Sequence, residues 1–445
     1  MLSEEYLSRL REHGTRPALV DGSVTLTYAQ LGAAIEEAVA RIDAQGVPRG
    51  STVALDGPVA PDLLVDLLAL IGRGDVVVPL GDVDVPARTR RMTITGADAL
   101  LSAGGAAVHQ PKSAPPELIS QLRAAGEGGL ILFTSGSTGE VKASCHALPR
   151  LLERFRRPRA PLRTLLFLLV DHIGGLNTLL SVLASGGCAV LLGARNAEGV
   201  AAAIERHAVE CLPTTPTFLR MLLISGEHRR HDLSALKLIT YGTEPMPALL
   251  LDELRRTFPG VRLKQTYGLT ETGILGTRSE AADGTWLEVG GDGWETRIVD
   301  GELWLRGPTT MLGYLNAQSP IDAEGWLNTH DLVELRGDQI RILGRKADLI
   351  NVGGRKVHPG EVERVIAELA NVLDVTVSSR RNAILGQVVA ATVVLADPED
   401  PDEFEERLRH HCREQGLEPH KIPAVVSYAA APAATPRMKK MRERS

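Results

Sequence analysis

Cysteine and long apolar runs are both scarce in this sequence, and each scarcity excludes some classes of protein. The four cysteines, Cys145, Cys188, Cys211 and Cys412, lie far apart and form no CxxC pair. Neither a disulfide framework nor a cysteine-based zinc site is therefore indicated, and a reducing, cytoplasmic compartment is expected. No uncharged apolar run reaches about 18 residues, so we expect no membrane-spanning helix. The charged N-terminus shows no signal-peptide pattern.

A large excess of either charge is also missing. The 445 residues include 49 lysines and arginines against 55 aspartates and glutamates, which gives a net charge of −6. This balance gives no reason to expect nucleic acid or an anionic membrane as a partner. We expect a small-molecule ligand or a protein partner, and a monomer or a homodimer. The length predicts two or three domains.

Two domains of different character are predicted. Up to about residue 295, short β-branched segments such as TVAL (52–55) alternate with amphipathic helices, which favours an α/β fold with parallel-rich sheets layered with helices. From about 285 to 345 the pattern predicts a small antiparallel β region, with a hairpin turn at Gly337. We assign residues 1–345 to a large N-terminal domain and residues 346–445 to a small α+β C-terminal domain.

Composition alone makes two more local predictions. The segment TLLFLLV (164–170) is apolar and short, which indicates a buried strand. The last residues, ATPRMKKMRERS (434–445), have little apolar surface, which is typical of a loose terminal tail.

A glycine-rich loop follows an apolar strand pattern in LILFTSGSTGEVKAS (130–144). It combines permissive glycines, hydroxyl donors and one lysine, a set that suits a polyphosphate. These residues are Thr134, Ser135, Gly136, Ser137, Thr138, Gly139 and Lys142. The spacing differs from that of P-loop NTPases, in which the lysine directly follows a glycine. Taken by itself, the stretch also fits a surface loop rich in serine and glycine.

Four further motifs follow the loop along the chain: YGLTETG (267–273), GWLNTHDL (325–332), GRKADLINVGGRKVHPGEVE (344–363) and TPRMKKMR (435–442). Together with TSGSTGEVK, they resemble the motifs of the acyl-adenylate-forming superfamily. That group contains acyl- and aryl-CoA synthetases, adenylation domains and luciferases, and in size the chain is similar to the compact o-succinylbenzoyl-CoA synthetases. It departs from the usual residues at Val141, Ala143, His330, Ala347 and Met438.

The resemblance implies a reaction in two halves. A carboxylate attacks the α-phosphorus of ATP and gives acyl-AMP and pyrophosphate, and a thiol of CoA or phosphopantetheine then takes the acyl group and releases AMP. Mg²⁺ is implied at the phosphates, held by Glu271 and Thr138, with Thr270 contacting the α-phosphate. Beyond the loop, the residues implied in ATP binding are Gly242, Thr243, Glu244, Gln265, Tyr267, Asp331 and Arg345.

Lys439 aligns with the catalytic lysine of the family, which bridges the carboxylate and the α-phosphate. The adjacent Lys440 competes for this role, because Met438 replaces the glycine that normally marks the register. The family also rotates its C-terminal domain between the two half-reactions. This implies a mobile small domain, a hinge at Lys346 and Ala347, and passage of the thiol past Gly353 and Gly354.

An acyl pocket is implied on one side of the nucleotide site. His172 lies in DHIGG (171–175), which resembles a histidine–glycine element of CoA ligases, and we also give it a catalytic role. A shift of one residue would place Asp171 there instead, as in amino-acid-activating domains, and an ordinary buried histidine stays open as well. The residues implied in the pocket are His146, His172, Gly174, Gly175, Tyr241, Thr266 and Gly273.

The leading hypothesis is a stand-alone acyl- or aryl-CoA ligase, since no carrier-protein segment follows residue 445. One alternative is an adenylation enzyme that loads an acyl or amino acid onto a separate carrier protein. Another is a diverged member that binds its ligands with little turnover. AMP transfer to a nucleophile other than a carboxylate also stays open.

Overall fold

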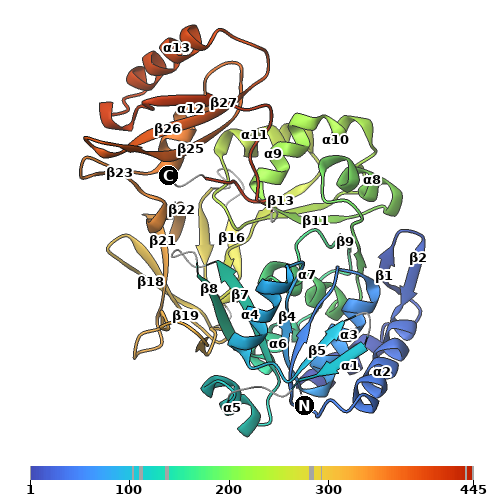
Figure 1. The fold of residues 1–445 in the computed structure, drawn as a ribbon. Helices are drawn as coiled ribbons and strands as arrows, with labels where there is room; N and C mark the ends of the chain where they lie inside the picture. The colour runs from blue at the N-terminus through green and yellow to red at the C-terminus, as the bar shows by residue number, and fades with distance from the viewer. Residues whose placement is uncertain are drawn as a thin grey trace.

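A computed structural model of the chain describes residues 2–102, 105–109, 114–135, 140–279, 285–291, 293–435 and 438–442. Two sheets layered with helices come first, an antiparallel sheet follows, and a small α+β unit ends the chain (Figure 1). The predicted α/β class, with an antiparallel region and a small C-terminal unit, is confirmed. The exact limits of the two predicted domains stay a prediction.

The first sheet is parallel except at one edge, where β1 and β2 pair antiparallel. Its strands in spatial order are β13 (Arg262–Gln265), β12 (Leu238–Tyr241), β11 (Cys211–Thr214), β9 (Arg163–Leu165), β10 (Cys188–Val190), β1 (Pro17–Asp21) and β2 (Val24–Thr27). The run of residues 164–170 is thus only partly a strand, because β9 ends at Leu165. The segment that follows leads into α7 (Ile173–Ala184), so the strand prediction was too long.

The second sheet has a parallel centre and antiparallel edges. Its strands in order are β20 (Gly313–Tyr314), β8 (Val141–Ala147), β7 (Gly129–Ser135), β4 (Val76–Pro79), β3 (Thr52–Leu55), β5 (Ala99–Ser102) and β6 (Gly105–Val108). The glycine-rich loop therefore joins two antiparallel neighbours, β7 and β8. Of that loop, residues 136–139 lie outside the described residues.

The largest hydrophobic cluster combines strands of both sheets with the helices α2 (Tyr28–Ala44), α3 (Pro61–Arg73) and α7. These helices bury nearly continuous apolar faces, as expected of elements packed between two layers. The remaining N-terminal helices are α1 (Leu2–Arg11), α4 (Val85–Thr95), α5 (Glu117–Ala124), α6 (Leu148–Glu153) and the 3₁₀ turn η1 (Arg154–Arg156). None of the helices in the described ranges is long and apolar enough to cross a membrane.

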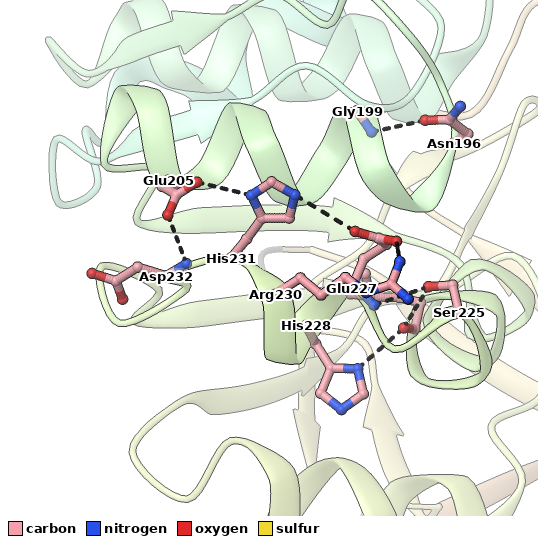
Figure 2. A network of polar contacts seen from close by, with 10 residues as sticks. Asn196, Gly199, Glu205, Ser225, Glu227, His228, Arg230, His231 and Asp232 are labelled. Carbon is pink, nitrogen blue, oxygen red and sulfur yellow. Dashed lines mark hydrogen bonds and ion pairs between the residues drawn. The ribbon is translucent and has the colours of Figure 1, made fainter.

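A second cluster covers the β11–β12–β13 part of the first sheet with α8 (Ala197–His207), α9 (Pro216–Ser225) and α11 (Ala248–Thr257). The short helix α10 (Glu227–Arg230) is tied to α8 by polar contacts (Figure 2). His231 Nδ1 lies 2.8 Å from Glu205 Oε2 of α8, and its Nε2 lies 3.5 Å from Glu227 Oε2 of α10. These contacts fix the connection that leads into β12.

The antiparallel sheet lies between the large part and the C-terminal unit in sequence. Its strands in order are β16 (Thr277–Ser279), β17 (Leu287–Val289), β22 (Gln339–Arg345), β21 (Leu327–Arg336), β19 (Glu302–Arg306) and β18 (Glu295–Val299). The predicted hairpin turn is present, because Arg336 pairs with Gln339 and Gly337 has φ 60°. A short pair, β14 (Gly268–Leu269) with β15 (Gly273–Ile274), precedes this sheet.

The C-terminal unit has its own hydrophobic cluster. Its elements are the 3₁₀ turn η2 (Lys346–Asp348), β23 (Ile350–Val352), β24 (Arg355–Val357), α12 (Pro359–Ile366), β25 (Val372–Asn382), β26 (Gly386–Leu395), α13 (Pro401–Glu414), the 3₁₀ turn η3 (Pro419–Lys421) and β27 (Val425–Tyr428). Within the described residues, the chain beyond β27 is not the loose tail that its composition predicts, and residues 436, 437 and 443–445 of that stretch lie outside the described residues. Backbone hydrogen bonds from Thr435 to Lys439 and from Met441 to Ala433 join residues 433–435 to residues 438–442, and we call these two segments the C-terminal hairpin.

Candidate functional site

The site forms where three adjacent parallel strands end together. Thr214 of β11, Tyr241 of β12 and Gln265 of β13 are aligned in register. Ligands of open α/β sheets bind beyond the carboxyl ends of the strands, where the loops leave the sheet. The loops that leave here begin at Thr215, at Gly242 and at Thr266.

The loop after β12 lies very close to the start of the loop after β13. A Cβ at Gly242 would lie 2.5 Å from both the carbonyl oxygen and Oγ1 of Thr266, so only glycine fits without displacing the backbone. The next residue, Thr243, has φ 70°, a left-handed conformation that costs a non-glycine residue about 1 kcal/mol or more. Buried Gln265 Oε1 has no hydrogen-bond partner within the described part of the chain. The strand ends therefore carry an unpaired acceptor beside a tight loop.

A buried acid joins the antiparallel sheet to this edge. Asp331 of β21 is 5% exposed and accepts a 2.6 Å hydrogen bond from the Tyr267 hydroxyl. Arg345 is its cross-strand neighbour, with Nε 3.3 Å from Asp331 Oδ1. Burial raises the pKa of Asp331, and the contacts with Arg345 and Tyr267 oppose this rise. The three predicted nucleotide residues thus form one cluster.

A second acid lies near the glycine-rich loop. Glu271 Oε1 accepts a 2.5 Å hydrogen bond from the hydroxyl of Tyr314, on β20. The same Tyr314 ring lies under Lys142, whose Nζ is 5.3 Å from the ring centroid. Since β20 pairs with β8, one strand brings the predicted loop lysine and the predicted metal carboxylate to the same tyrosine. Thr138 and the other residues from Gly136 to Gly139 lie outside the described residues.

The residues predicted for the acyl pocket differ in their surroundings. His146 of β8 is 1% exposed, and the backbone of Thr270 is the polar group that acts on its ring. Burial lowers the pKa of His146 to about 4, so its imidazole is neutral at pH 7. His172 directly precedes α7, and its Nε2 lies 3.6 Å from Oδ2 of Asp171. Gly273 belongs to β15, against which α7 packs.

The two glycines after His172 have a packing role in the structure. A Cβ at Gly175 would lie 2.1 Å from the carbonyl oxygen of Leu169, and one at Gly174 would lie 3.1 Å from Leu168. Close approach of α7 to the preceding segment therefore requires glycine at 175. Tyr241 is 2% exposed and part of the second hydrophobic cluster, and Thr266 Oγ1 donates to its carbonyl oxygen at 3.1 Å.

The C-terminal hairpin reaches this edge from about 200 residues away in sequence. The Met438 carbonyl accepts a hydrogen bond from the Thr215 hydroxyl, and the Lys440 N–H donates to Glu244. Lys439 lies between these two contacts. The Lys440 side chain is held elsewhere, with Nζ 2.7 Å from the Val375 carbonyl oxygen of β25.

Two acids of the C-terminal unit hold the hairpin on its other side. Glu363 of α12 accepts two 2.8 Å hydrogen bonds from Arg442 and lies 3.6 Å from Lys440 Nζ. Burial raises the pKa of Glu363, but Lys440 and Arg442 outweigh it and leave that pKa below its ordinary value. Lys440 Nζ also lies 3.9 Å from Asp374.

The predicted hinge is held by a buried glutamate. Lys346 Nζ lies 2.6 Å from Glu302 Oε1, and His330 Nδ1 lies 3.1 Å from Glu302 Oε2. His330, which stands where the motif usually has glycine, keeps a left-handed backbone with φ 57°. Ala347 lies in η2. Gly353 and Gly354 form the β23–β24 turn, where the Gly353 N–H donates to Leu385, so this turn is attached to the C-terminal unit and not to the strand ends.

Three residues of the site were missed by reasoning from the sequence: Thr215, Glu302 and Tyr314. Thr215 precedes Pro216, a pattern typical of a helix start, and its hydroxyl does cap α9. Tyr314 lies in MLGYLN (311–316), between two recognised motifs, and has no pattern of its own that marks it. Glu302 begins β19, where polar and apolar residues alternate, a pattern that by itself does not distinguish this buried acid from an exposed one.

Comparisons with known proteins agree with this arrangement. Residues 125–315 match the model of the AMP-binding enzyme family, and residues 361–438 match the model of the AMP-binding enzyme C-terminal domain. An indoleacetate–CoA ligase of Aromatoleum aromaticum is 28% identical over 83% of each chain. A medium/long-chain-fatty-acid–[acyl-carrier-protein] ligase of Mycobacterium tuberculosis is 28% identical over 84% of this chain and 81% of its own.

Among solved structures, the o-succinylbenzoate CoA synthetase of Bacillus subtilis in complex with its acyl-adenylate intermediate is similar in fold. The TM-score is 0.75 with 24% sequence identity, over 98% of this chain and 96% of the other. This likeness covers both the large part and the C-terminal unit.

Proposed function

Because the chain belongs to the AMP-binding family of adenylate-forming acid–thiol ligases, we propose that it activates an acyl or aryl acid as acyl-AMP and transfers it to CoA. Family membership makes it an ATP-dependent acid ligase that uses a thiol of the CoA type. The choice of CoA rests on the resemblance of DHIGG (171–175) to an element of CoA ligases and on relatives such as the indoleacetate–CoA ligase. The relative that acts on acyl carrier protein supports the main alternative acceptor.

The observation that carries the proposal is the position of the C-terminal hairpin. Contacts of Met438 with Thr215 and of Lys440 with Glu244 place the backbone of Lys439 at the loop proposed to hold the adenine. Two motifs far apart in sequence therefore meet at the carboxyl ends of the sheet strands, where an α/β protein binds its ligand. The second lysine, Lys440, is directed to Val375, which favours Lys439 as the catalytic residue.

The residues proposed to bind ATP differ in the part of the nucleotide that their side chains suit. The unpaired Gln265 Oε1 is an acceptor suited to the adenine amine, and the Asp331 carboxylate is suited to the ribose hydroxyls. Arg345 limits the cost of burying that carboxylate by pairing with it. Tyr267 fixes the orientation of the acid through its hydroxyl. The glycine-rich loop with Lys142 would hold the β- and γ-phosphates.

The chemical difficulty is the approach of a carboxylate to a polyanion. Lys439 would place its ammonium group between the two and stabilise the charge that develops as the oxygen attacks the α-phosphorus. His146 would not share this task as a cation, because its pKa of about 4 keeps it neutral. A ring nitrogen that is not used by the Thr270 backbone would instead hydrogen-bond the acyl group.

The residues near the phosphates fit a bound Mg²⁺. Glu271 offers one carboxylate, and the described residues contain no cluster of three acid, histidine or cysteine side chains that could hold a metal alone. This matches the way Mg²⁺ binds with nucleotides, through one or two carboxylates, waters and the phosphates themselves. When bound, the ion would supply positive charge at the β- and γ-phosphates. Tyr314 would orient Glu271 toward it through the 2.5 Å hydrogen bond.

Replacement of that tyrosine tests the metal assignment. In Tyr314→Phe we expect the Mg²⁺ concentration needed for half-maximal pyrophosphate exchange to rise about tenfold, because partners that orient a metal ligand contribute this much to metal affinity. The measurement is a Mg²⁺ titration at saturating ATP. Tyr428→Phe is the control, since this half-exposed tyrosine lies in the C-terminal unit. An unchanged Mg²⁺ requirement in Tyr314→Phe would contradict the role of Tyr314 in orienting Glu271 toward the metal.

The proposed function itself is tested by ATP–pyrophosphate exchange over a panel of aryl, fatty and amino acids. The acid that supports exchange is then offered either CoA or a phosphopantetheinylated carrier protein, and the thioester is identified by mass. Rapid thioester formation with CoA is the expected result. Transfer only to the carrier protein would overturn the choice of acceptor, and nucleotide binding without exchange for any acid would overturn the activity.

A further inference from the structure

Met438 occupies the position where the motif of the family that the sequence resembles usually has glycine, and its backbone is in a conformation that favours glycine. Its φ is 55°, in the left-handed region that costs a residue with a side chain about 1 kcal/mol or more. Its side chain is nevertheless half-buried and packs against the hydrophobic cluster that contains α9 and α11. The chain thus accepts backbone strain at this residue and gains an apolar contact that glycine could not make.

The same turn has two polar contacts with the large domain. The Thr215 hydroxyl accepts from the Phe218 N–H at 3.1 Å as the cap of α9, and it donates to the Met438 carbonyl. The Glu244 carboxylate accepts from the Lys440 N–H through one oxygen. Its other oxygen accepts from the Thr217 hydroxyl at 2.7 Å and from the Thr217 N–H at 3.2 Å. The two contacts lie on either side of Lys439.

From these contacts we propose that Met438 and Glu244 are positioning residues that hold Lys439 at the strand ends and set how much of the enzyme is in the adenylate-forming arrangement. The inference rests on the proposed function, in which Lys439 serves only the first half-reaction. In Figure 1 the red end of the chain runs beside α9, which belongs to the large part, while β25 and α12 hold the hairpin from the other side. Withdrawal of Lys439 for the second half-reaction must break the contacts to α9 and Glu244.

Substitutions at Met438 separate the apolar contact from the backbone strain. Met438→Gly and Met438→Asn both suit a left-handed backbone but lack the apolar side chain. We expect each to slow pyrophosphate exchange about tenfold, since loss of a partly buried side chain shifts an equilibrium by about this factor. Thioester formation from supplied acyl-AMP should be unchanged or faster. Met438→Leu keeps the apolar contact and should retain most of the exchange activity.

Two further variants show whether the effect of Met438→Gly is specific to the contacts of Met438 and Glu244. Met441 lies three residues further on the same hairpin and is 42% exposed, so Met441→Gly should leave both half-reactions unchanged. Glu244→Ala combined with Met438→Gly should lose less exchange activity than the product of the two single losses, because both variants release one segment. Equal loss of both half-reactions in Met438→Gly, or exchange at the wild-type rate, would overturn the proposal. No exchange in the wild-type enzyme would instead count against the proposed function.

A measurement of the distance between two spin labels, which does not depend on the reaction, completes the test. The four native cysteines are buried, so spin labels can be directed to cysteines introduced at exposed Glu288 of β17 and Glu406 of α13. In the nucleotide-free protein we expect one main distance between the labels, and a second, clearly increased population in Met438→Gly. Identical distance distributions in the two proteins would contradict a positioning role.

Discussion

Lys439→Ala should lower the rate of acyl-adenylate formation by about 10²–10³, while thioester formation from supplied acyl-AMP stays close to that of the wild type. The loss corresponds to about 3–4 kcal/mol, the usual contribution of one charged group directed at the transition state. The split is expected because the structure holds Lys439 at the loop proposed to bind adenine. Pyrophosphate exchange measures the first half-reaction, and CoA consumption with purified acyl-AMP measures the second.

Lys440→Ala is the matched comparison. Its side chain contacts Val375 and Glu363 in the C-terminal unit, so its removal should weaken docking of the hairpin and cost at most about tenfold in exchange. If Lys440→Ala proved the more damaging variant, the register of the catalytic lysine would have to move by one residue. If Lys439→Ala slowed both half-reactions equally, a role confined to adenylation would be wrong.

Asp331→Asn should raise the KM for ATP about 100-fold and leave the KM for the acid nearly unchanged. The carboxylate is proposed to accept both ribose hydroxyls, and hydrogen bonds to a charged group contribute about 1.5–3 kcal/mol each. Asparagine keeps the volume of the side chain but replaces one acceptor oxygen by a donor. Initial rates of pyrophosphate exchange over a range of ATP concentrations give the two KM values.

The buried position of Asp331 calls for a folding control. Its oxygen accepts from Tyr267, so the variant should be compared by thermal unfolding as well as by kinetics. Asp338→Asn, at the exposed turn of the same β21–β22 hairpin, should change neither KM nor melting temperature. Asp331→Asn should raise the KM for 2′-deoxy-ATP much less than it raises the KM for ATP, because 2′-deoxy-ATP already lacks one of the two ribose hydroxyls that hydrogen-bond to the carboxylate. Equal losses would remove Asp331 from the ribose site.

Where local pattern and burial agreed, the fold could be predicted from the sequence. The β21–β22 hairpin follows from alternation and one glycine, and α13 from a capping aspartate with a clear apolar stripe. Prediction failed where tertiary contacts decided. The strand β25 has a β-branched first half, but its second half, SSRRN (378–382), is polar, and no local preference indicated that its pairing with β26 continues through this half. The C-terminal hairpin looked like a tail because its sequence has little apolar surface, whereas the structure holds it through ion pairs with Glu363 together with one apolar contact, that of Met438.

Much of the candidate site could be predicted from the sequence because its motifs are long and follow one another in a fixed order along the chain. Tyr267, Asp331 and Arg345 come from three separate motifs and do form one cluster. Tyr314 and Thr215 could not be found in this way, since their importance lies in partners about 40 and 220 residues away. Gly175 was placed in the pocket by its motif, and the structure shows that backbone packing against Leu169 already requires it.

The glycine-rich loop lies between two antiparallel strands, because β7 ends at Ser135 and β8 begins at Val141. A loop that opens a helix presents the positive end of a macrodipole to phosphate, whereas strands carry only a small net dipole. Without that contribution, anion binding here has to depend on discrete cations such as Lys142. The nucleotide affinity of this protein should therefore weaken with rising ionic strength more steeply than that of a helix-backed phosphate loop.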